Sequence, residues 1–401
     1  MELVNQQFIK NENMKLLYNA IYDNSGISRA QLAQQARLSK TTVSTLIDEL
    51  ITRDFIYDSG ANDTTSVGRK PNSLHVKAES YYIIVISWIE HYVNAYLIDI
   101  TGATTYDRHL RLSGDDTYIT LSRKYVDESI LTIVPRNKIL GICVVVSAMI
   151  DRNANEIYST TVSLQKSGCK NLIDTLRSTF TDFPVALLGD TPCFAYAEKT
   201  YAHIAEPDFA LINFDRGIGA TIFNGGKMIG KADNASTQFG HYSINPHGDL
   251  CTCGNRGCLE AVWGEHALKK RVSEAGTSPA LNRLPAITFS SLGSAALYGD
   301  VISQKVIVAM AESFSYALAN LISIVNPKLI ILGGKSTCLG DLFLESLKEK
   351  LKTVGLKKMI DHVEIKYSKL DSNAYLNGAM RYFFDNYYAF TEGSRDSFFI
   401  G

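Results

Sequence analysis

Three cysteines and one histidine lie close together in the second half of the chain. The thiols belong to Cys251, Cys253 and Cys258, and the imidazole belongs to His241. Three thiolates and one imidazole make a tetrahedral donor set, which borderline-soft Zn²⁺ favours. Because four protein ligands leave no position for water, the pattern predicts one structural zinc ion per chain and not a catalytic metal.

Glycines stand among these four residues, at Gly248, Gly254 and Gly257. They would let a short loop fold back so that all the donors point inward. Two alternatives stay open at this point. A disulfide between Cys251 and Cys253 would close a ring that is too small to be comfortable. The cysteines could also be unrelated buried residues beside a surface histidine, but their spacing favours the zinc interpretation.

The segment from Gly240 to Glu260 also carries a family resemblance. Its GH pair, followed by CxCGxxGCxE, resembles the signature of the ROK family, which contains sugar-responsive repressors and sugar kinases. The resemblance covers nearly the whole chain: NPKLIILGG (326–334) resembles the nucleotide-side glycine turn of the family, and 373–379 resembles its closing helix. It implies an α/β body of the ribonuclease-H-like kind found in actin and hexokinase, with two lobes facing a cleft and the zinc loop in the second lobe.

The composition fits a globular protein with more than one domain. The chain has 401 residues, of which 46% are hydrophobic and 20% are charged. Its N-terminus is polar, and no apolar run approaches the ~20 residues of a membrane span, so neither a signal peptide nor a membrane partner is expected. Seven cysteines without a paired framework favour a reducing cytoplasm. The net charge of −1 means that contacts with nucleic acid would depend on local charge.

Hydrophobic periodicity predicts the elements that would position these residues. Strands are expected at 81–86, 92–100, 105–112, 140–146 and 185–188, with helices at 119–133 and 171–180. This βββαβαβ order resembles the ribonuclease-H-like unit. A second set of short strands is expected within 209–229, ahead of the zinc loop. A helix from 259, helices over 301–325 and 342–351, and a strand at 329–332 complete the prediction.

The first 76 residues predict a winged helix-turn-helix. Helices are expected over 14–22, from the N-cap Ser28, and from the N-cap Ser39 to about residue 54. Wing strands are expected at 55–57 and 74–76. GRKP at 68–71 resembles the GR(R/K)P wing of ROK repressors, and its cations could reach a minor groove or phosphates.

The third helix would bury one apolar stripe and present short hydroxyl side chains and a cation at its start, which suits a major groove. The surrounding segment from 27 to 45 contains cations and no acid, so a neutral domain can still bind DNA through one patch. A helical protein-interaction module is the alternative. The predicted DNA contacts are Arg29, Arg37, Lys40, Thr41, Thr42, Ser44, Thr45, Arg69 and Lys70.

The predicted domains are therefore a DNA-binding domain at 1–76 and a ROK body at 77–401. Within the body, lobe 1 is expected at about 77–195 plus 380–401, and lobe 2 at about 196–379.

The resemblance leaves a choice between a kinase and a sensor. ROK kinases carry DxGxT between the first two strands, where this chain has SWIEHY at 87–92. The second phosphate turn of the family resembles GTGIGAG, where this chain has DRGIGAT at 215–221. Asp215 would repel a triphosphate. We therefore predict that the chain is not an enzyme and has no catalytic residue.

The sugar side of the family pattern is partly retained. Asp190 aligns with the general base of the kinases, and His241 and Glu260 match sugar contacts of the family. Gln238 stands where the family has glutamate, and Gly189 where it has asparagine before the aspartate. The resemblance implies an effector site of Asp190, Gln238, His241 and Glu260. A solvated strand-end acid and an ordinary loop residue are the alternatives for Asp190 and Gln238.

These observations predict a transcriptional regulator, a repressor of sugar uptake or catabolism genes whose operator affinity depends on a bound sugar. Its partners would be double-stranded operator DNA with palindromic half-sites, a small sugar effector, and further copies of itself in a homodimer or homotetramer. Two alternatives remain. One is a sugar kinase with a DNA-binding head, and the other is a regulator with a vestigial sugar site that a partner protein controls.

Overall fold

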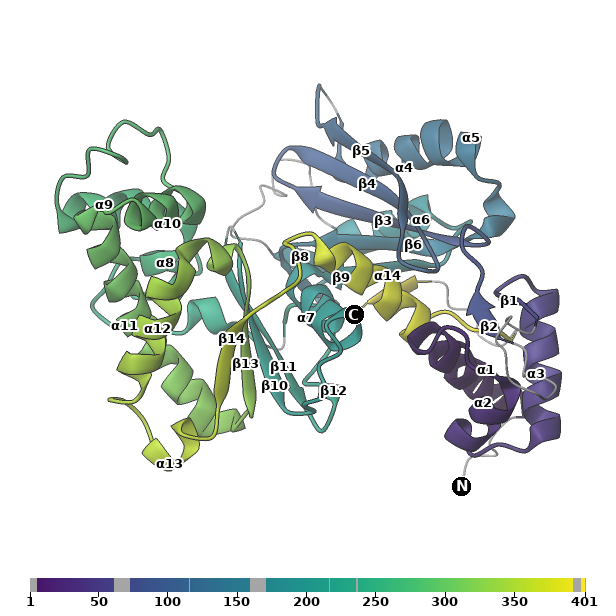
Figure 1. The fold of residues 1–401 in the computed structure, drawn as a ribbon. Coiled ribbons are helices and arrows are strands. Elements are labelled where there is room, and N and C mark those ends of the chain that lie inside the picture. The colour runs from purple at the N-terminus through teal and green to yellow at the C-terminus, as the bar shows by residue number, and fades with distance from the viewer. Residues whose placement is uncertain are drawn as a thin grey trace. The chain divides into compact units, whose positions relative to one another are not determined.

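The computed structural model describes residues 6–60, 73–114, 116–158, 171–215, 217–235, 237–391 and 398–400. The chain divides into two compact units, which we describe separately (Figure 1). Unit 1 comprises Met1–Val145, Asp174–Leu187 and Met380–Phe399. Unit 2 comprises Val146–Ile173, Leu188–Ala379 and Ile400–Gly401. The predicted division into three parts remains a prediction.

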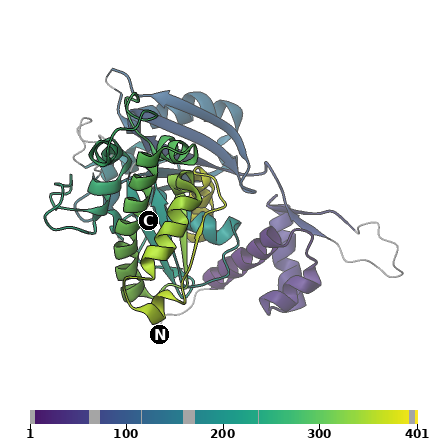
Figure 2. The same ribbon diagram turned by 60° about the vertical axis from the view of Figure 1, so that its left-hand side comes forward.

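A winged helix-turn-helix opens unit 1. It contains α1 (Gln6–Asp23), α2 (Arg29–Ala36) and α3 (Lys40–Thr52), followed by the antiparallel strands β1 (Ile56–Asp58) and β2 (Leu74–Val76). Figure 2 shows the three helices gathered together with the two wing strands beside them. Both predicted N-caps are confirmed: Ser28 forms a capping box with Gln31, and the Ser39 hydroxyl accepts from the amide of Thr42.

Helix α1 begins well before the predicted start at residue 14. The cause is packing against the end of the chain, which local sequence cannot reveal. Asn11 is buried, and its side-chain oxygen accepts from the amide of Phe390 at 2.7 Å. The Thr391 hydroxyl donates to the Gln7 carbonyl at 3.2 Å. These bonds hold the polar first turns of α1 in place.

An aromatic cluster joins the winged helix to the C-terminal residues of unit 1. The Tyr18 ring lies 4.6 Å from Phe384, and Phe55 lies 4.9 Å from Phe390, measured between centroids. The Arg53 guanidinium donates to the Phe390 carbonyl. The winged helix is therefore packed into the core of unit 1.

A six-stranded sheet forms the rest of unit 1, in the order β15-β9-β6-β3-β4-β5. Its strands are β3 (Tyr82–Ile89), β4 (Tyr92–Asp99), β5 (Thr104–Arg111), β6 (Ile139–Val146), β9 (Val185–Gly189) and β15 (Phe398–Ile400). Helix α4 (Tyr118–Tyr125) packs against β4, and a short π-helix (Val126–Ile130) and α5 (Leu131–Ile133) continue it. Helix α14 (Ala374–Asn386) lies against β6, where a Cβ at Gly141 would be 2.2 Å from Phe383. The predicted βββαβαβ order is confirmed, with α6 (Leu172–Thr179) as its second helix.

Unit 2 is built on a five-stranded sheet in the order β12-β11-β10-β13-β14. Central β10 (Phe209–Phe214) runs antiparallel to β11 (Ile218–Asn224) and parallel to β13 (Leu329–Gly334). Strands β12 (Lys227–Met228) and β14 (Glu364–Tyr367) form the edges, and a separate hairpin pairs β7 (Met149–Asp151) with β8 (Glu156–Tyr158).

Side chains of β10 alternate between two cores, as the pleat requires. Phe209 and Leu211 pack with Phe194 of α7 (Asp190–Tyr201), whereas Ile212 and Phe214 join the larger core. Helices on that second side include α10 (Phe289–Leu297), α11 (Val301–Val325) and α12 (Gly340–Leu351), with α8 (Leu259–Trp263), α9 (Leu268–Ala275) and α13 (Lys357–Ile360) near them.

Helix α11 is the one helix of the described ranges that is long and apolar enough to cross a membrane. However, 56% of its most apolar 18-residue stretch is buried inside the protein. Phe314 of α11 stacks on Phe214 of β10 at 4.8 Å. This burial is typical of the core helix of a globular unit.

Candidate functional site

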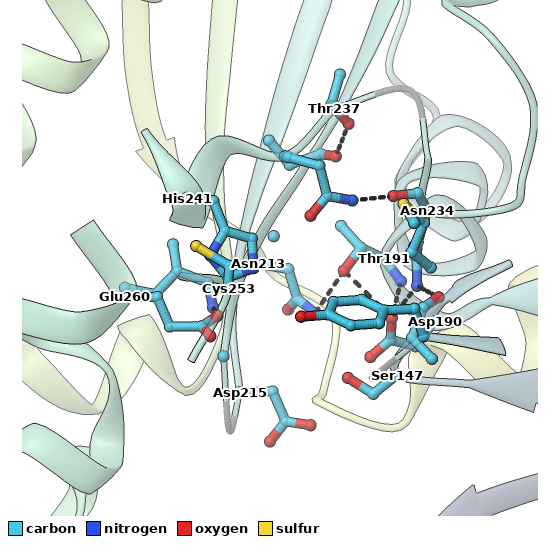
Figure 3. A pocket seen from close by; sticks show the side chains of 18 residues that line it. Ser147, Asp190, Thr191, Asn213, Asp215, Asn234, Thr237, His241, Cys253 and Glu260 are labelled. Atoms are coloured by element: carbon cyan, nitrogen blue, oxygen red, sulfur yellow. Dashed lines mark hydrogen bonds between the residues drawn. The ribbon is translucent and has the colours of Figure 1, made fainter. Parts of the chain in front are cut away.

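A cavity of about 330 Å³ lies in unit 2, between the starts of several elements (Figure 3). Its wall includes the start of α7, the β10–β11 turn, the segment before His241 and the start of α8. The loop 251–258, which we call the metal-site loop because its three cysteines could hold a metal ion, also contributes through Cys253. The structure brings the four predicted effector residues, Asp190, Gln238, His241 and Glu260, to this one cavity. Sequence reasoning did not identify the other polar residues of the wall, which are Ser147, Tyr158, Thr191, Asn213, Asn234 and Thr237.

Asp190 is the first residue of α7 and is half-buried. Its Oδ1 accepts from the amide of Thr191 at 2.7 Å and from the Nδ2 of Asn234 at 3.0 Å. Burial, and then the negative charge of Asp215, raise the pKa of the Asp190 carboxyl above its usual value. The side chain is thus an oriented hydrogen-bonding group of the cavity and not a solvated strand-end acid.

Glu260 extends from α8 and is buried. Its Oε2 accepts from the amide of Ile218 at 2.9 Å. A Cβ at Gly217 would lie 2.3 Å from this oxygen, so that glycine makes room for the carboxylate. A Cβ at Gly240 would lie 2.2 Å from the Ile218 carbonyl. Gly217 and Gly240 therefore each make room for a contact inside the protein.

Lys335 directly follows the glycine pair of β13. Its Nζ forms ion pairs with two carboxylates. It lies 3.2 Å from Asp215 and 3.1 Å from Glu265. Glu265 also accepts from the amide of Phe289 at 3.2 Å. The glycine turn of β13 and the β10–β11 turn are thus joined by a lysine between two acids.

The β3–β4 turn, which holds the SWIEHY segment at 87–92, is a tight hairpin. The Tyr118 hydroxyl accepts from the amide of His91 and donates to the Ile89 carbonyl, both at 3.1 Å. Trp88 is buried beneath the turn, with its Nε1 bonded to the Ser122 hydroxyl at 3.0 Å. The backbone amide at the tip therefore already has a partner within unit 1.

The histidine and the three cysteines of the motif converge. One donor atom from each of His241, Cys251, Cys253 and Cys258 lies within 4.8 Å of the other three. The sulfurs of Cys253 and Cys258 are 3.7 Å apart, and the Cys251 sulfur is 3.5 Å from Nδ1 of His241. A tetrahedral site with zinc–sulfur bonds of about 2.3 Å and a zinc–nitrogen bond of about 2.0–2.1 Å has corresponding edges of about 3.8 and 3.6 Å. This cluster can hold a metal ion.

The loop geometry contradicts the two alternatives for these cysteines. Cys251, Cys253 and Cys258 are all free thiols, so the disulfide alternative is wrong, and their convergence shows that they are not unrelated residues. Gly254 and Gly257 have positive φ angles of 89° and 65°. A Cβ at Gly257 would lie 1.7 Å from the carbonyl of residue 245, so only glycine allows this turn. His241 and Cys253 also line the cavity, which gives the two sites a common wall.

The start of α3 is the other candidate site. Lys40, Thr41 and Thr45 are exposed there, and exposed Arg37 closes α2 in the left-handed region at φ 55°. The remaining predicted side chains also make internal contacts. Arg29 pairs with Asp48 at 2.8 Å and bonds the Ser44 hydroxyl at 3.1 Å, while the Thr42 hydroxyl lies 2.8 Å from that of Ser39. Arg69 and Lys70 lie outside the described residues, and the predicted DNA contacts remain predictions.

Comparisons with known proteins match both parts of the chain. A model of the ROK family matches residues 88–385, and a model described as winged helix-turn-helix DNA-binding matches residues 10–57. The xylose repressor of Caldicellulosiruptor bescii is 27% identical, over 97% of this chain and 99% of its own length. The DNA-binding transcriptional dual regulator NagC of Escherichia coli K12 is 25% identical, over 92% of each chain.

Two solved structures show the same fold. A ROK family transcriptional regulator, described as a homolog of the E. coli MLC protein, aligns with a TM-score of 0.76 at 22% identity, over 92% of this chain and 95% of that chain. A ROK family glucokinase from Streptomyces griseus, solved with glucose and AMPPNP, aligns with a TM-score of 0.59 at 20% identity, over 74% of this chain and 97% of that chain. The match to the regulator therefore extends over more of this chain than the match to the kinase.

Proposed function

Because this chain belongs to the ROK family, with a winged helix-turn-helix at its N-terminus, we propose that it is a transcriptional repressor of sugar uptake or catabolism genes. The observation that carries the proposal is the presence of two sites in one chain. One is the exposed start of α3 with Lys40, and the other is the cavity of unit 2 with Asp190 and Glu260. A sugar in that cavity would change the affinity for operator DNA.

The proposed DNA partner is a double-stranded operator with two inverted half-sites about one helical turn apart. Palindromic half-sites require two-fold related copies of the protein, so a homodimer or homotetramer is the proposed assembly. Relatives along the whole chain bear the names of transcriptional regulators, which supports this reading and a place of action in the cytoplasm with the DNA.

The proposed effector is one monosaccharide or a derivative of it. The cavity volume of about 330 Å³ lies at the lower end of the ~300–1,000 Å³ typical of small-molecule sites. Carboxylates such as Asp190 and Glu260 accept hydrogen bonds from hydroxyl groups, which a sugar supplies in a row. One relative is named xylose repressor and another, from Escherichia coli O6:H1, is named N-acetylglucosamine repressor, so xylose and N-acetylglucosamine are the first two sugars to test.

Helix α14 offers a route from the cavity to the DNA-binding face. Its first turns belong to unit 2, where a Cβ at Gly378 would lie 1.8 Å from the Cys193 carbonyl of α7. Its last turns belong to unit 1, where Asp385 accepts from Lys15 and Asn19 of α1. A shift at the start of α7 would thus be passed along one continuous helix. The metal-site loop, which shares a wall with the cavity, would move with it.

The metal that suits the cluster is zinc, as one structural ion per chain. His241, Cys251, Cys253 and Cys258 would hold it, and all four tetrahedral positions would be filled by protein. Such an ion supplies folding energy to the loop that carries it and offers no open position for substrate.

Replacing Asp190 with asparagine tests the effector site. The change keeps the shape of the side chain but removes a charged acceptor, and hydrogen bonds to charged groups contribute about 1.5–3 kcal/mol. We expect the affinity for the best-binding sugar, measured by calorimetry, to fall by about 10- to 100-fold. Asp361→Asn on the exposed surface of the same unit should leave it unchanged. Equal affinities for the three proteins would contradict this placement of the site.

We further propose that the protein is not a kinase. The tip amide of the β3–β4 turn is bonded to Tyr118, and Asp215 occupies the other turn as part of an ion-pair group with Lys335. A triphosphate would have to displace both arrangements and face a carboxylate.

A coupled assay of ADP release over a panel of sugars provides the test, with an authentic ROK glucokinase as the positive control. We expect no turnover above the background without protein. Sustained release of ADP that depends on one sugar would instead support the alternative of a sugar kinase with a DNA-binding head.

A further inference from the structure

Asn234 occupies the space that a side chain at position 189 would fill. A Cβ built on Gly189 would lie 2.3 Å from both Cγ and Oδ1 of Asn234. Position 189 is also where the family pattern has asparagine before the aspartate, and this chain has glycine. The chain thus lacks a carboxamide at position 189, at the end of β9, and the carboxamide of Asn234 lies in that space instead.

The hydrogen bonds of Asn234 fix its amide tightly. Nδ2 lies 3.0 Å from the Ala148 carbonyl, 3.3 Å from the Val146 carbonyl and 3.0 Å from Oδ1 of Asp190. The backbone at Asn234 has a φ of 57°, a left-handed conformation that asparagine tolerates better than most residues. The amide of Gly189 donates to the Ala232 carbonyl at 2.7 Å, which keeps the two segments side by side.

This arrangement determines how Asp190 meets the cavity. The Thr191 amide and the Asn234 side chain bond the same oxygen, Oδ1, and so set the direction of the other carboxylate oxygen. A donated N–H also favours the ionised, hydrogen-bond-accepting form of the carboxylate. Figure 3 shows Asn234 close to Asp190 and Thr191 at one side of the cavity.

We propose that Asn234 is a positioning and specificity-determining residue of the effector site, which takes over the place of the side chain absent at Gly189. It holds Asp190 as an oriented acceptor for a sugar hydroxyl, and its own side chain limits the shape of the sugar beside α7. The sugar part of this inference rests on the proposed function. The structural part does not rest on it. We call this part the exchange: Asn234 fills the space that a side chain at position 189 would occupy.

A cycle of Asn234→Gly, Gly189→Asn and the double variant tests the exchange without any ligand. Asn234→Gly removes the amide bonds, and Gly189→Asn alone forces two side chains into one space. Each single variant should lower the melting temperature by about 4 °C or more, whereas the double variant should return to within about 2 °C of the unchanged protein. Asparagine also suits position 189 because that residue caps α7. Losses that simply add in the double variant would overturn the exchange.

The same four proteins then test the role in sugar binding, with D-xylose and N-acetylglucosamine as the probes. Each single variant should bind the preferred sugar at least about tenfold more weakly, and the double variant should recover to within about threefold. The ratio of the two affinities should change in Asn234→Gly, which a purely structural residue would not cause. DNA affinity without sugar should stay the same in all four, because the α3 face belongs to unit 1.

The possible failures can be told apart. Single variants that bind sugar like the unchanged protein, while the melting temperatures still show the exchange, would overturn the specificity role of Asn234. An unchanged protein that binds neither probe would contradict the effector proposal, and the melting cycle would then decide the exchange alone.

Discussion

Replacing Cys253 with serine should lower the melting temperature of unit 2 by about 10 °C or more, because energy gained at a structural metal is folding energy. The Cys253 sulfur lies 3.7 Å from that of Cys258, and the loop between them turns at glycines with positive φ. Without the metal, no metal–ligand bonds would offset the conformational entropy that is lost when this loop and its four side chains become ordered. Differential scanning calorimetry with a parallel zinc determination measures both quantities.

The matched control is Cys338→Ser, at an exposed cysteine of the same unit. It should leave the melting temperature and the metal content unchanged. A strong chelator added to the unchanged protein should reproduce the effect of Cys253→Ser. An unaltered melting curve for Cys253→Ser, or a purified protein without bound metal that melts normally, would contradict the structural metal.

Replacing Lys40 with glutamate should weaken operator binding by about 100-fold at moderate salt, because a cation is replaced by an anion that faces the phosphates. Lys40 is the exposed first residue of α3, beside the Ser39 cap. A glutamate in the first turn interacts favourably with the helix dipole, so the stability of the folded protein should not decrease. The slope of log affinity against log salt should fall by about 1 for each altered lysine.

Lys305→Glu makes the same change of charge on an exposed position of α11 in unit 2 and should leave DNA binding nearly unchanged. Both variants should keep the sugar affinity of the unchanged protein. If Lys40→Glu bound operator DNA as tightly as Lys305→Glu did, the start of α3 would not be the DNA-binding face.

Sequence signals identified the parts of the fold whose stabilising contacts are local. The N-caps Ser28 and Ser39 and the bounds of α11 were all predicted, because caps and apolar periodicity lie within one segment. The predicted fold class, a winged helix-turn-helix followed by an actin-like ROK body, is confirmed. The convergence of His241, Cys251, Cys253 and Cys258 was also predicted, since the three cysteines lie in one short loop.

Contacts between distant segments could not be predicted in this way. The first turns of α1 depend on Phe390, at the other end of the chain. The group of Asp215, Glu265 and Lys335 joins three separate segments. Asn234 meets Asp190 only because two segments run side by side in the fold. The glycine at 189 was the one sequence signal that a side chain was missing there, and it did not show which residue would fill the gap.

The central claim is that occupancy of the cavity in unit 2 controls DNA binding by unit 1. It is tested most directly by the affinity of the purified full-length protein for duplexes selected from a random-sequence library, measured with and without sugars. We predict enrichment of inverted half-sites about one helical turn apart, and a loss of affinity of about tenfold or more when D-xylose, N-acetylglucosamine or a close derivative is added. Control of DNA binding by the cavity would be contradicted if the protein enriched no sequence. It would also be contradicted if the affinity for the enriched duplex were the same with every sugar as without sugar.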